Sequence, residues 1–340
     1  MPPQYAPPSR SASIRDVARA AGASPATVSR VIDDETRVGE EARAKVSRVT
    51  AGLGFRPDPL AQAPAGGRVP WVTVLTSDIA PYGAAATLRG MEAEARAAGF
   101  SVVTSVLPHG CDQMDLAMRV NRPGEAVMVI AFDDVGVRAL RALPRDVAVA
   151  AVVECRPDDE DPAAWQVCLD GRTAAAHATR HLLSLGHRTV HHVATPSPGG
   201  RQRIQGWQDA LSAAGRPVPD FAWAGSSLRS GHLAGRSLME DRSVTAVLCG
   251  DDALALGVML AARESGRNIP GDLSVVGFGD SPSSAYLVPS LTTVRFDFEG
   301  LGRACFGLLH RDMGLRTSAD VHAWSEPELV VRESSGPAPA

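Results

Sequence analysis

The first regular pattern along the chain is that of two short amphipathic helices separated by a turn. In the first helix, apolar residues recur at the spacing of one buried helical face, at Ile14, Val17, Ala18 and Ala21. Gly22 then permits a sharp reversal that a residue with a Cβ atom would resist. Ser24 is a suitable N-cap for the second helix, and Pro25 occupies its first position, where a missing N–H costs nothing. The buried side of the second helix comprises Val28, Val31 and Ile32.

These two helices predict a helix-turn-helix, whose second helix typically enters the major groove of DNA. The outward residues of that helix are small, hydroxylic or cationic, namely Ala26, Thr27, Ser29 and Arg30. Small side chains permit close approach, hydroxyls bond phosphates or base edges, and arginine pairs bidentately with guanine. An ordinary helical hairpin packed into a core is the alternative. We predict that Pro25, Ala26 and Arg30 contact base edges, and we include Ser24 among the DNA-binding residues.

A third helix is predicted over residues 38–53, where one face carries Val38, Ala42, Val46, Val49 and Leu53. Acidic residues open this segment and basic residues lie further along, as the helix dipole favours. Residues 57–68 are rich in Pro and Gly, which indicates a linker. We therefore expect a disordered tail at residues 1–12, a small all-α head at 13–56 and a hinge or linker at 57–69.

From Trp71 the pattern changes to short apolar runs rich in β-branched residues, which alternate with helical patterns. The runs occupy residues 71–76, 101–106, 126–131, 147–153, 189–194, 245–249 and 273–278. The helical patterns include Thr87–Ala98, Thr173–Leu185 and Arg203–Ala213. Such alternation predicts βαβ units, with parallel sheets covered on both faces. Because about 270 residues exceed one such sheet, we expect two Rossmann-like subdomains with a cleft between them over residues 70–333.

The two ends of the chain give further expectations. The last seven residues are Ser-Ser-Gly-Pro-Ala-Pro-Ala, and we expect residues 334–340 to form a flexible tail. No leucine heptads occur there, which favours a homodimer over a tetramer held by a C-terminal coiled coil. The first ten residues lack the apolar core of a signal peptide, and no apolar run is long enough to span a bilayer. We therefore expect a cytoplasmic protein with no membrane partner.

Charge is divided unevenly along the 340 residues. Residues 1–68 carry ten basic and seven acidic side chains, a net charge of +3, whereas the rest carries 24 basic and 31 acidic side chains, a net charge of −7. A mildly basic head on an acidic body suits binding of double-stranded DNA by the head alone.

Missing motifs exclude several classes of enzyme. Lys45, in the predicted head, is the only lysine in the sequence, so there is no P-loop and no pocket lysine for Schiff-base chemistry. No G-x-G-x-x-G follows the first predicted strand, and no G-x-S-x-G elbow occurs. The five cysteines include no C-x-x-C pair, which indicates buried free thiols. His177 and His181 have a helical spacing that can bind metal, but no third ligand converges on them. We expect no metal, no cofactor and no enzymatic activity.

Two segments of the head resemble the lactose-repressor/galactose-repressor family, Asp16-Val-Ala-Arg-Ala-Ala-Gly22 and Ser24-Pro-Ala-Thr-Val-Ser-Arg-Val31. Later segments also resemble this family, at Val167–Gly171 through His181–Arg188, and at Arg203–Trp207, Val275–Asp280, Pro289–Val294 and Glu328–Arg332. The resemblance covers nearly the whole chain. It implies an α/β effector region similar to periplasmic sugar-binding proteins, attached to the helix-turn-helix head.

For the head and linker, the resemblance implies that Thr27 and Ser29 contact phosphates. It also implies that the linker folds as a hinge helix on the operator, with a leucine wedged into the minor groove. Alignment with the family places Pro64 at that leucine position, and Leu60 is the nearest leucine, one helical turn earlier. Proline disfavours helix interiors, although it can itself act as an apolar wedge between base steps. The hinge helix is therefore either shortened or bends the operator less.

For the effector region, the resemblance implies that Arg203 reaches across the cleft to ligand hydroxyls or a carboxylate, for which its planar fork is suited. A surface arginine that opens a helix is the alternative. Asp251 corresponds to a position that bonds sugar hydroxyls, and Asp78 and Asp170 lie at similar strand ends. Each of these aspartates is also suited to be a helix N-cap.

Other family positions differ in this sequence. Tyr82 is the only aromatic candidate after the first predicted strand, and Ser226 stands where an aromatic residue often stacks on the sugar ring. Gly279 replaces the first aspartate of a Gly-Phe-Asp-Asp segment, and Asp280 is retained behind it. These departures leave open a differently shaped sugar, a nucleoside-like compound or no effector.

The sequence thus predicts a ligand-responsive, sequence-specific DNA-binding transcriptional regulator. We expect a repressor of carbohydrate-related genes that acts as a homodimer on a palindromic operator. One alternative is a regulator with a degenerate cleft, which responds to a non-sugar effector or a protein partner. Another is a sugar-binding receptor or enzyme with a similar α/β body, which the head and the missing secretion and catalytic motifs oppose.

Overall fold

The computed structural model describes residues 14–24, 27–28, 31, 39–52, 71–108, 110, 119–120, 126–144, 147–154, 165–313 and 324–339. The chain divides into two compact units, residues 1–70 and 71–340. Each unit has its own hydrophobic core.

The first unit contains α1 (Ile14–Ala21) and α3 (Glu40–Gly52), with further helical residues at positions 27, 28 and 31. Its core is formed by Val17, Ala18, Ala21, Val28 and Val46. Gly22 has a φ of +59°, in the left-handed region that favours glycine, so the predicted turn forms where the missing Cβ allows it. Ser24 Oγ accepts a hydrogen bond from the backbone N–H of Thr27 at 3.0 Å, the geometry of the predicted N-cap.

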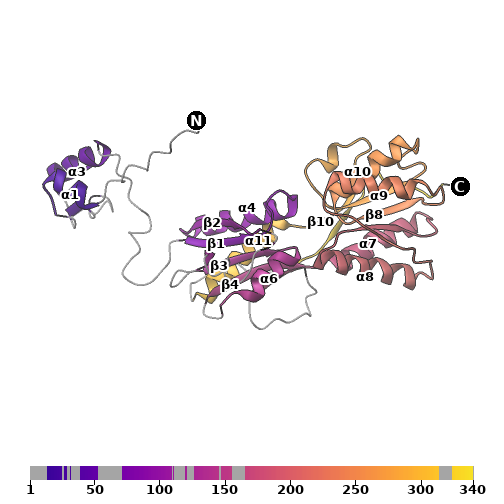
Figure 1. Ribbon diagram of the computed structural model, residues 1–340, viewed down its shortest axis with the longest axis horizontal. Helices are drawn as coiled ribbons and strands as arrows, with labels where there is room; N and C mark the ends of the chain where they lie inside the picture. The colour runs from indigo at the N-terminus through magenta and orange to yellow at the C-terminus, as the bar shows by residue number, and fades with distance from the viewer. Residues whose placement is uncertain are drawn as a thin grey trace, which may run out of the picture. The chain divides into compact units, whose positions relative to one another are not determined.

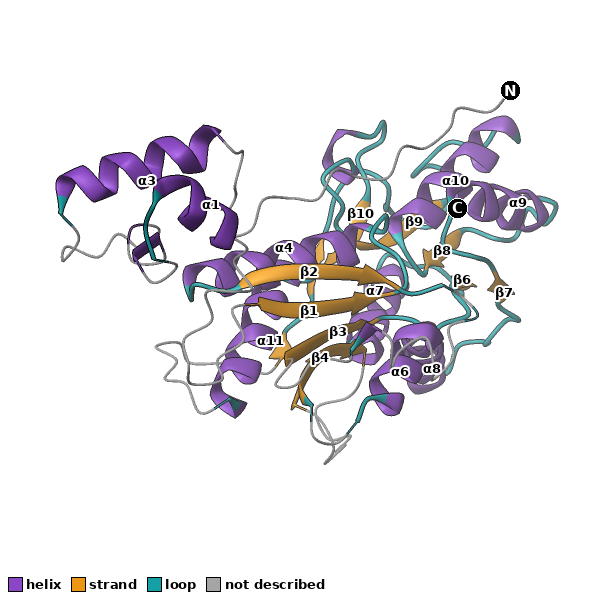
Figure 2. Ribbon diagram, turned by 60° about the vertical axis from the view of Figure 1, so that its left-hand side comes forward, coloured by secondary structure: helices purple, strands orange, loops and turns teal. Residues whose placement is uncertain are grey.

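The second unit, residues 71–340, contains a six-stranded sheet of order β11-β5-β4-β3-β1-β2, in which every neighbouring pair is parallel. Its strands are β1 (Trp71–Thr76), β2 (Ser101–Val106), β3 (Ala126–Ala131), β4 (Ala148–Glu154), β5 (Trp165–Leu169) and β11 (Trp324–Ser325). Helix α6 (Asp134–Ala142) packs on one face, and α4 (Tyr82–Ala97) and α11 (Phe298–Asp312) pack on the other. Figure 2 shows β1 to β4 of this first lobe with these helices around them.

The other lobe has a second six-stranded sheet, of order β12-β10-β9-β8-β6-β7. Its strands are β6 (His191–Ala194), β7 (Ala222–Trp223), β8 (Ala246–Cys249), β9 (Ser274–Gly279), β10 (Thr292–Arg295) and β12 (Glu328–Val330). Only the β10–β12 pair is antiparallel. Helices α7 (Gly171–Ser184) and α8 (Pro198–Ala213) cover one face, α9 (Leu228–Met239) and α10 (Asp252–Glu264) cover the other, and the short helix η1 (Ser284–Tyr286) follows β9.

The chain passes between the two lobes three times. It passes from β5 to α7, from β10 to α11, and from β11 to β12, so each lobe contains segments that are distant in sequence. Figure 1 shows the two sheets side by side within this unit. The predicted fold class, a helix-turn-helix head with a two-lobed α/β body, is confirmed.

All seven predicted apolar runs form strands, with ends that move by no more than two residues. The short strands β5, β7, β10, β11 and β12 were not among the predicted runs. Most of these have few residues, and their place is set by pairing with neighbours rather than by a long apolar run of their own.

The expectation of a flexible C-terminal tail is wrong for residues 334–339. Ser334 is fully buried, where its hydroxyl donates to the carbonyl of Val275 at 2.6 Å and accepts from the N–H of Thr292 at 2.8 Å. Further along, the N–H of Ala338 donates to the carbonyl of Leu185 at 2.9 Å. The small, polar composition of this segment suggested flexibility, but its hydroxyls and backbone groups satisfy buried groups beside β9 and β10.

The expectation of free thiols also needs a correction. Cys168, in β5, is disulfide-bonded. Cys249 and Cys305 are free and buried, as expected.

Replacing Ser334 by alanine is expected to lower the free energy of unfolding by about 1–3 kcal/mol, because the buried N–H of Thr292 loses its acceptor. Urea unfolding followed by tryptophan fluorescence measures this change. Ser212→Ala, at an exposed position near the end of α8, is the matched control and is expected to leave the stability unchanged. Equal stabilities of all three proteins would contradict the packed tail.

His192 in β6 is expected to destabilise the fold in mild acid. Its ring lies 5.5 Å from that of Trp207, its Nδ1–H donates to the carbonyl of Leu248 at 2.9 Å, and burial lowers its pKa from 6.5 to about 4. Below pH 6.5 the unfolded chain takes up a proton that the native protein does not, so stability falls until the pH reaches about 4.

This loss amounts to about 3 kcal/mol for His192 alone. Urea unfolding at pH 7 and pH 5 is expected to show a smaller pH dependence for His192→Gln than for the wild-type protein. The exposed His177, changed to Gln, is the control. An unchanged pH dependence in His192→Gln would refute the assignment.

Candidate functional site

Of the predicted DNA-binding residues, the structure describes two, Ser24 and Thr27. Ser24 is exposed, and its hydroxyl lies 2.9 Å from that of Thr27 as well as accepting from the Thr27 N–H. The hydroxyls of both residues therefore lie together at the start of the second helix. The other predicted DNA contacts lie outside the described residues, namely Pro25, Ala26, Ser29, Arg30, Leu60 and Pro64.

In the α/β body, Arg203 lies where the two lobes meet. It stands on α8 of the second lobe, and its guanidinium pairs with Glu154 at the end of β4 in the first lobe. Nη1 lies 3.2 Å from Oε2 and donates to Oε1 at 3.4 Å. Both side chains are only 8% exposed, so the ion pair is buried. Arg203 is therefore not the surface arginine of the alternative interpretation.

Two neighbours complete the surroundings of the Arg203 guanidinium within the second lobe. Nη2 donates to Thr195 Oγ1 at 3.5 Å, and the guanidinium carbon lies 4.6 Å from the centre of the Phe278 ring. A cation over an aromatic face is attracted by the ring quadrupole. The guanidinium thus contacts a carboxylate, a hydroxyl and a ring.

Helix α8 makes two more contacts with the first lobe next to this pair. Arg201 Nη2 donates to Asp134 at 3.0 Å, between side chains that are about half exposed. Gln202 Nε2 donates to the backbone carbonyl of Glu154 at 3.4 Å. Three successive residues of α8 therefore contact the first lobe, which makes this helix the main described contact between the lobes.

Glycines make room for the Glu154 carboxylate. A Cβ atom at Gly199, in the first turn of α8, would lie 1.2 Å from Glu154 Oε2, and one at Gly171 would lie 3.5 Å from the same oxygen. The carboxylate thus occupies the space that a side chain at Gly199 would fill. It lies beside the first turn of α8, where the helix dipole favours negative charge.

Burial acts against the ionised form of this carboxylate. It raises the pKa of Glu154 above its ordinary value, and the Arg203 guanidinium opposes that rise. Burial also raises the pKa of Asp251, while hydrogen bonds from the Leu254 N–H and the Ser226 hydroxyl, together with Arg203, oppose it. Arg203 therefore interacts electrostatically with two acidic groups, one in each lobe.

Two predicted ligand residues are helix N-caps. Asp170 accepts from the N–H of Thr173 at 2.9 Å at the start of α7, and Asp251 accepts from the N–H of Leu254 at 2.7 Å at the start of α10. The exposed Ser226 lies near Asp251, and its side chain lowers the pKa of that carboxyl against the effect of burial. Ser226 and Asp251 are thus neighbours, and Asp251 interacts electrostatically with Arg203.

Asp78 and Tyr82 follow β1. Asp78 is exposed, and its carboxylate accepts from the N–H of Ala80 at 2.9 Å in a tight turn. Tyr82 is half-buried, with its ring edge-to-face on Phe298 at 5.9 Å. Their described contacts are local ones within the first lobe.

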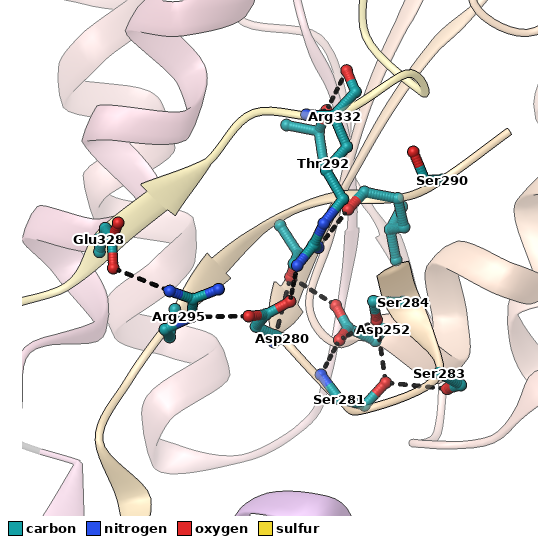
Figure 3. Close-up of polar contacts among 12 residues, drawn as sticks. Asp252, Asp280, Ser281, Ser283, Ser284, Ser290, Thr292, Arg295, Glu328 and Arg332 are labelled. Atoms are coloured by element: carbon teal, nitrogen blue, oxygen red, sulfur yellow. Dashed lines mark hydrogen bonds and ion pairs between the residues drawn. The ribbon is translucent and has the colours of Figure 1, made fainter. Parts of the chain in front are cut away.

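Asp280 directly follows β9, and its described contacts are with β10 and Arg332 rather than with Arg203. Its carboxylate accepts from Arg295 Nε at 2.7 Å and lies 2.7 Å from Arg332 Nη2 (Figure 3). Arg295 also donates to Glu328 at 3.2 Å, so charges on β10 and β12 are joined to the end of β9. Both oxygens of Asp280 are therefore engaged within the protein.

Two further polar residues were not predicted from the sequence. One is Glu154, at the junction where the two lobes meet, and the other is Asp252, in the second lobe. Glu154 follows the predicted strand over residues 147–153 by one position, and a charged residue at the end of a buried strand was the available signal. Asp252 is buried and accepts from Thr293 at 2.6 Å, from the Ser281 N–H at 2.6 Å and from Ser284 at 2.8 Å (Figure 3). It fixes the loop after β9 next to Asp251.

Among the residues that the structure describes, no group of three or more His, Cys, Asp or Glu side chains is placed to hold a metal ion. No helix in the described part of the chain is long and apolar enough to cross a membrane.

Family models match both units of the chain. Residues 13–58 match the model described as bacterial regulatory proteins of the lacI family, and residues 179–335 match the periplasmic binding protein-like domain. The catabolite control protein A of Priestia megaterium is 31% identical over 315 residues, which are 89% of this chain and 93% of that protein. The lactose operon repressor of Escherichia coli is 29% identical and covers 85% of this chain and 81% of its own.

Solved structures match nearly the whole chain as well. A lac repressor dimer bound to operator and the anti-inducer ONPF is 27% identical, covers 96% of this chain and 100% of its own, and has a TM-score of 0.75. A complex of the transcriptional regulator CelR with cellobiose is 27% identical, covers 95% and 99%, and has a TM-score of 0.69. The chain belongs to the lactose-repressor family, and it is a ligand-responsive, DNA-binding regulator of transcription.

Proposed function

We propose that the protein is a repressor that binds a two-fold-symmetric operator as a homodimer and is controlled by an effector bound beside Arg203. The observation that carries this proposal is the buried guanidinium of Arg203 at the junction of the two lobes. The lac repressor complex with operator and anti-inducer, which matches 96% of this chain, supports the same assignment. The head supplies the DNA contacts and the α/β body supplies the control.

The switch follows from the cross-lobe contacts. An effector that competes with Glu154 for Arg203, or with Arg203 for Glu154, changes the free energy of this arrangement of the two lobes relative to alternative arrangements. It shifts the equilibrium only if its affinity differs between the two arrangements. The same free energy then couples effector binding to operator binding, and the coupling is reciprocal.

The chemistry of the junction favours a carbohydrate effector. The similar regulator CelR binds cellobiose, and a lac repressor structure contains ONPG. A guanidinium fork and nearby carboxylates suit vicinal hydroxyls, which both donate and accept hydrogen bonds. The target genes are accordingly carbohydrate-related. This proposal places the protein in the cytoplasm and assigns it no enzymatic reaction.

A second candidate is a regulator whose effector is not a sugar or is a protein partner. The observation that favours it is the pairing of Arg203 with Glu154, which already satisfies part of the guanidinium. A thermal-shift screen against sugars, nucleosides and sugar phosphates, followed by operator binding with each hit, distinguishes the two candidates.

Arg30→Ala is expected to reduce discrimination between operator and random DNA by about tenfold to a hundredfold, since a bidentate contact with guanine is worth about 1–3 kcal/mol. The operator is first selected from a random library by the wild-type protein. Both dissociation constants are then measured at one salt concentration. Arg138→Ala, at an exposed position of the body, is the control for loss of charge. Unchanged discrimination by Arg30→Ala would rule out its base-reading role.

Arg203→Met is expected to weaken binding of the best compound from the screen by about tenfold to a hundredfold, because charged hydrogen bonds to the effector are lost. Isothermal titration calorimetry measures the affinity. Arg201→Met removes the neighbouring exposed cross-lobe charge and serves as the control. If Arg203→Met does not fold, the double variant Glu154→Gln/Arg203→Met removes both buried charges together. Full affinity in either folded variant would exclude Arg203 from the effector site.

A further inference from the structure

The positive charge of Arg203 is already balanced inside the protein. Glu154 lies 3.2 Å from its Nη1, and both side chains are more than nine-tenths buried. An effector carboxylate or phosphate that paired with Arg203 would displace Glu154 or share the cation with it. Either outcome leaves a buried anion without full compensation, and such uncompensated charges are strongly destabilising.

The unsatisfied polar atoms of the junction are mainly acceptors. Among the described residues, Glu154 Oε2 and Gln202 Oε1 are buried side-chain oxygens that accept no hydrogen bond, although Glu154 Oε2 is ion-paired with Arg203 Nη1 at 3.2 Å. Arg203 Nε is the one buried donor of these three residues that lacks an acceptor. A ligand with N–H or O–H groups satisfies the oxygens, whereas an anion offers them only more acceptors.

The acidic groups that interact with Arg203 add negative charge next to these oxygens. Asp251 interacts electrostatically with Arg203 from the second lobe, so one guanidinium interacts with the carboxyl groups of both Glu154 and Asp251. Burial raises the pKa of both carboxyls, and the positive charge of Arg203 opposes both rises. A cationic or donor-rich ligand would oppose them further.

The position of Glu154 is fixed by the backbone. Its carboxylate fills the space over Gly199 that a Cβ atom would occupy, and a second glycine, Gly171, borders it. A side chain at Gly199 would clash with the carboxylate in this position, whereas a Cβ atom at Gly171 would only contact it. The acid is therefore built into the junction and is not a mobile surface group.

On the basis of the effector site proposed above, we propose that Glu154 sets its charge selectivity. It makes the junction accept neutral or cationic effectors, such as polyols and amino sugars, and exclude phosphorylated or carboxylated ones. Arg203 then acts in the site as one half of a neutral pair, which offers both a donor and an acceptor to hydroxyl or amine groups.

Inorganic phosphate tests this selectivity directly in the full-length chain. Isothermal titration calorimetry is carried out on the wild-type protein, Glu154→Gln and the double variant Glu154→Gln/Arg203→Met. We expect Glu154→Gln to bind phosphate about tenfold or more tightly than the wild-type protein, and the double variant to lose that gain. The double variant also separates phosphate bound at Arg203 from phosphate bound by the basic head.

Asp134→Asn is the matched control, because it removes another cross-lobe acid that is paired with arginine but is half exposed. It is expected to bind phosphate as the wild-type protein does. Glu154→Ala gives the same comparison if the glutamine variant does not fold. Equal phosphate affinities of the wild-type protein and the Glu154 variant would overturn the proposal, as would an equal gain in Asp134→Asn.

A hexose, the corresponding hexosamine and the corresponding hexose 6-phosphate form a second set of probes, each assayed for its effect on operator binding. We expect no effect of the hexose phosphate on the wild-type protein. A hexose phosphate that changes operator binding through Arg203 would overturn the charge selectivity and leave the proposed function intact. If none of these compounds changes operator binding, the proposed function is overturned. The phosphate titration still tests the charge selectivity set by Glu154 in that case.

Discussion

The body of this regulator depends on a buried ion pair that joins its two lobes. Glu154 and Arg203 come from different sheets, and each is 8% exposed where they meet. Removing two charges from water is costly, and only their mutual attraction and further hydrogen bonds offset that cost. The cost is offset only while the lobes hold these residues together. The relative position of the lobes and the chemistry of the proposed effector site therefore depend on the same few atoms.

Several elements of the fold converge on this pair. The end of β4 presents Glu154, the first turns of α8 present Gly199 and Arg203, and the end of β9 presents Phe278 under the guanidinium. These are the ends of parallel strands and the beginnings of helices, where open α/β sheets place their ligand contacts. Asp252 fixes the neighbouring loop after β9 through bonds to Ser281, Ser284 and Thr293.

A second charged network lies at the crossovers. Asp280 joins Arg295 on β10 and Arg332 after β12, and Arg295 reaches Glu328 (Figure 3). Each of these strands is adjacent to a segment that passes between lobes. This network joins the ends of β9, β10 and β12 within the second lobe, whereas the Glu154–Arg203 pair joins the second lobe to the first.

The sequence predicted the architecture well because buried parallel strands are continuous apolar runs. The runs at 71–76, 101–106 and 126–131 became strands without any change of their ends. The interpretation of Asp170 and Asp251 as helix N-caps followed from residue type and position, and both caps form. Local chemistry was sufficient for each of these features.

Features that depend on distant partners were not predictable in the same way. Glu154 stands one residue beyond a predicted strand, and only folding brings α8, 49 residues later, to its carboxylate. The segment 334–339 has a flexible composition, but Ser334 bonds residues more than 40 positions away. The DNA contacts at Arg30, Leu60 and Pro64 remain predictions from the sequence.

The most direct test of the account is the affinity of the full-length protein for its selected operator, with and without the compound that stabilises it most in a thermal-shift screen. Coupling between the junction of the lobes and the DNA-binding head predicts a change in the operator dissociation constant of about fivefold to 150-fold at saturating compound. An operator dissociation constant that is the same with and without the bound compound would contradict the account.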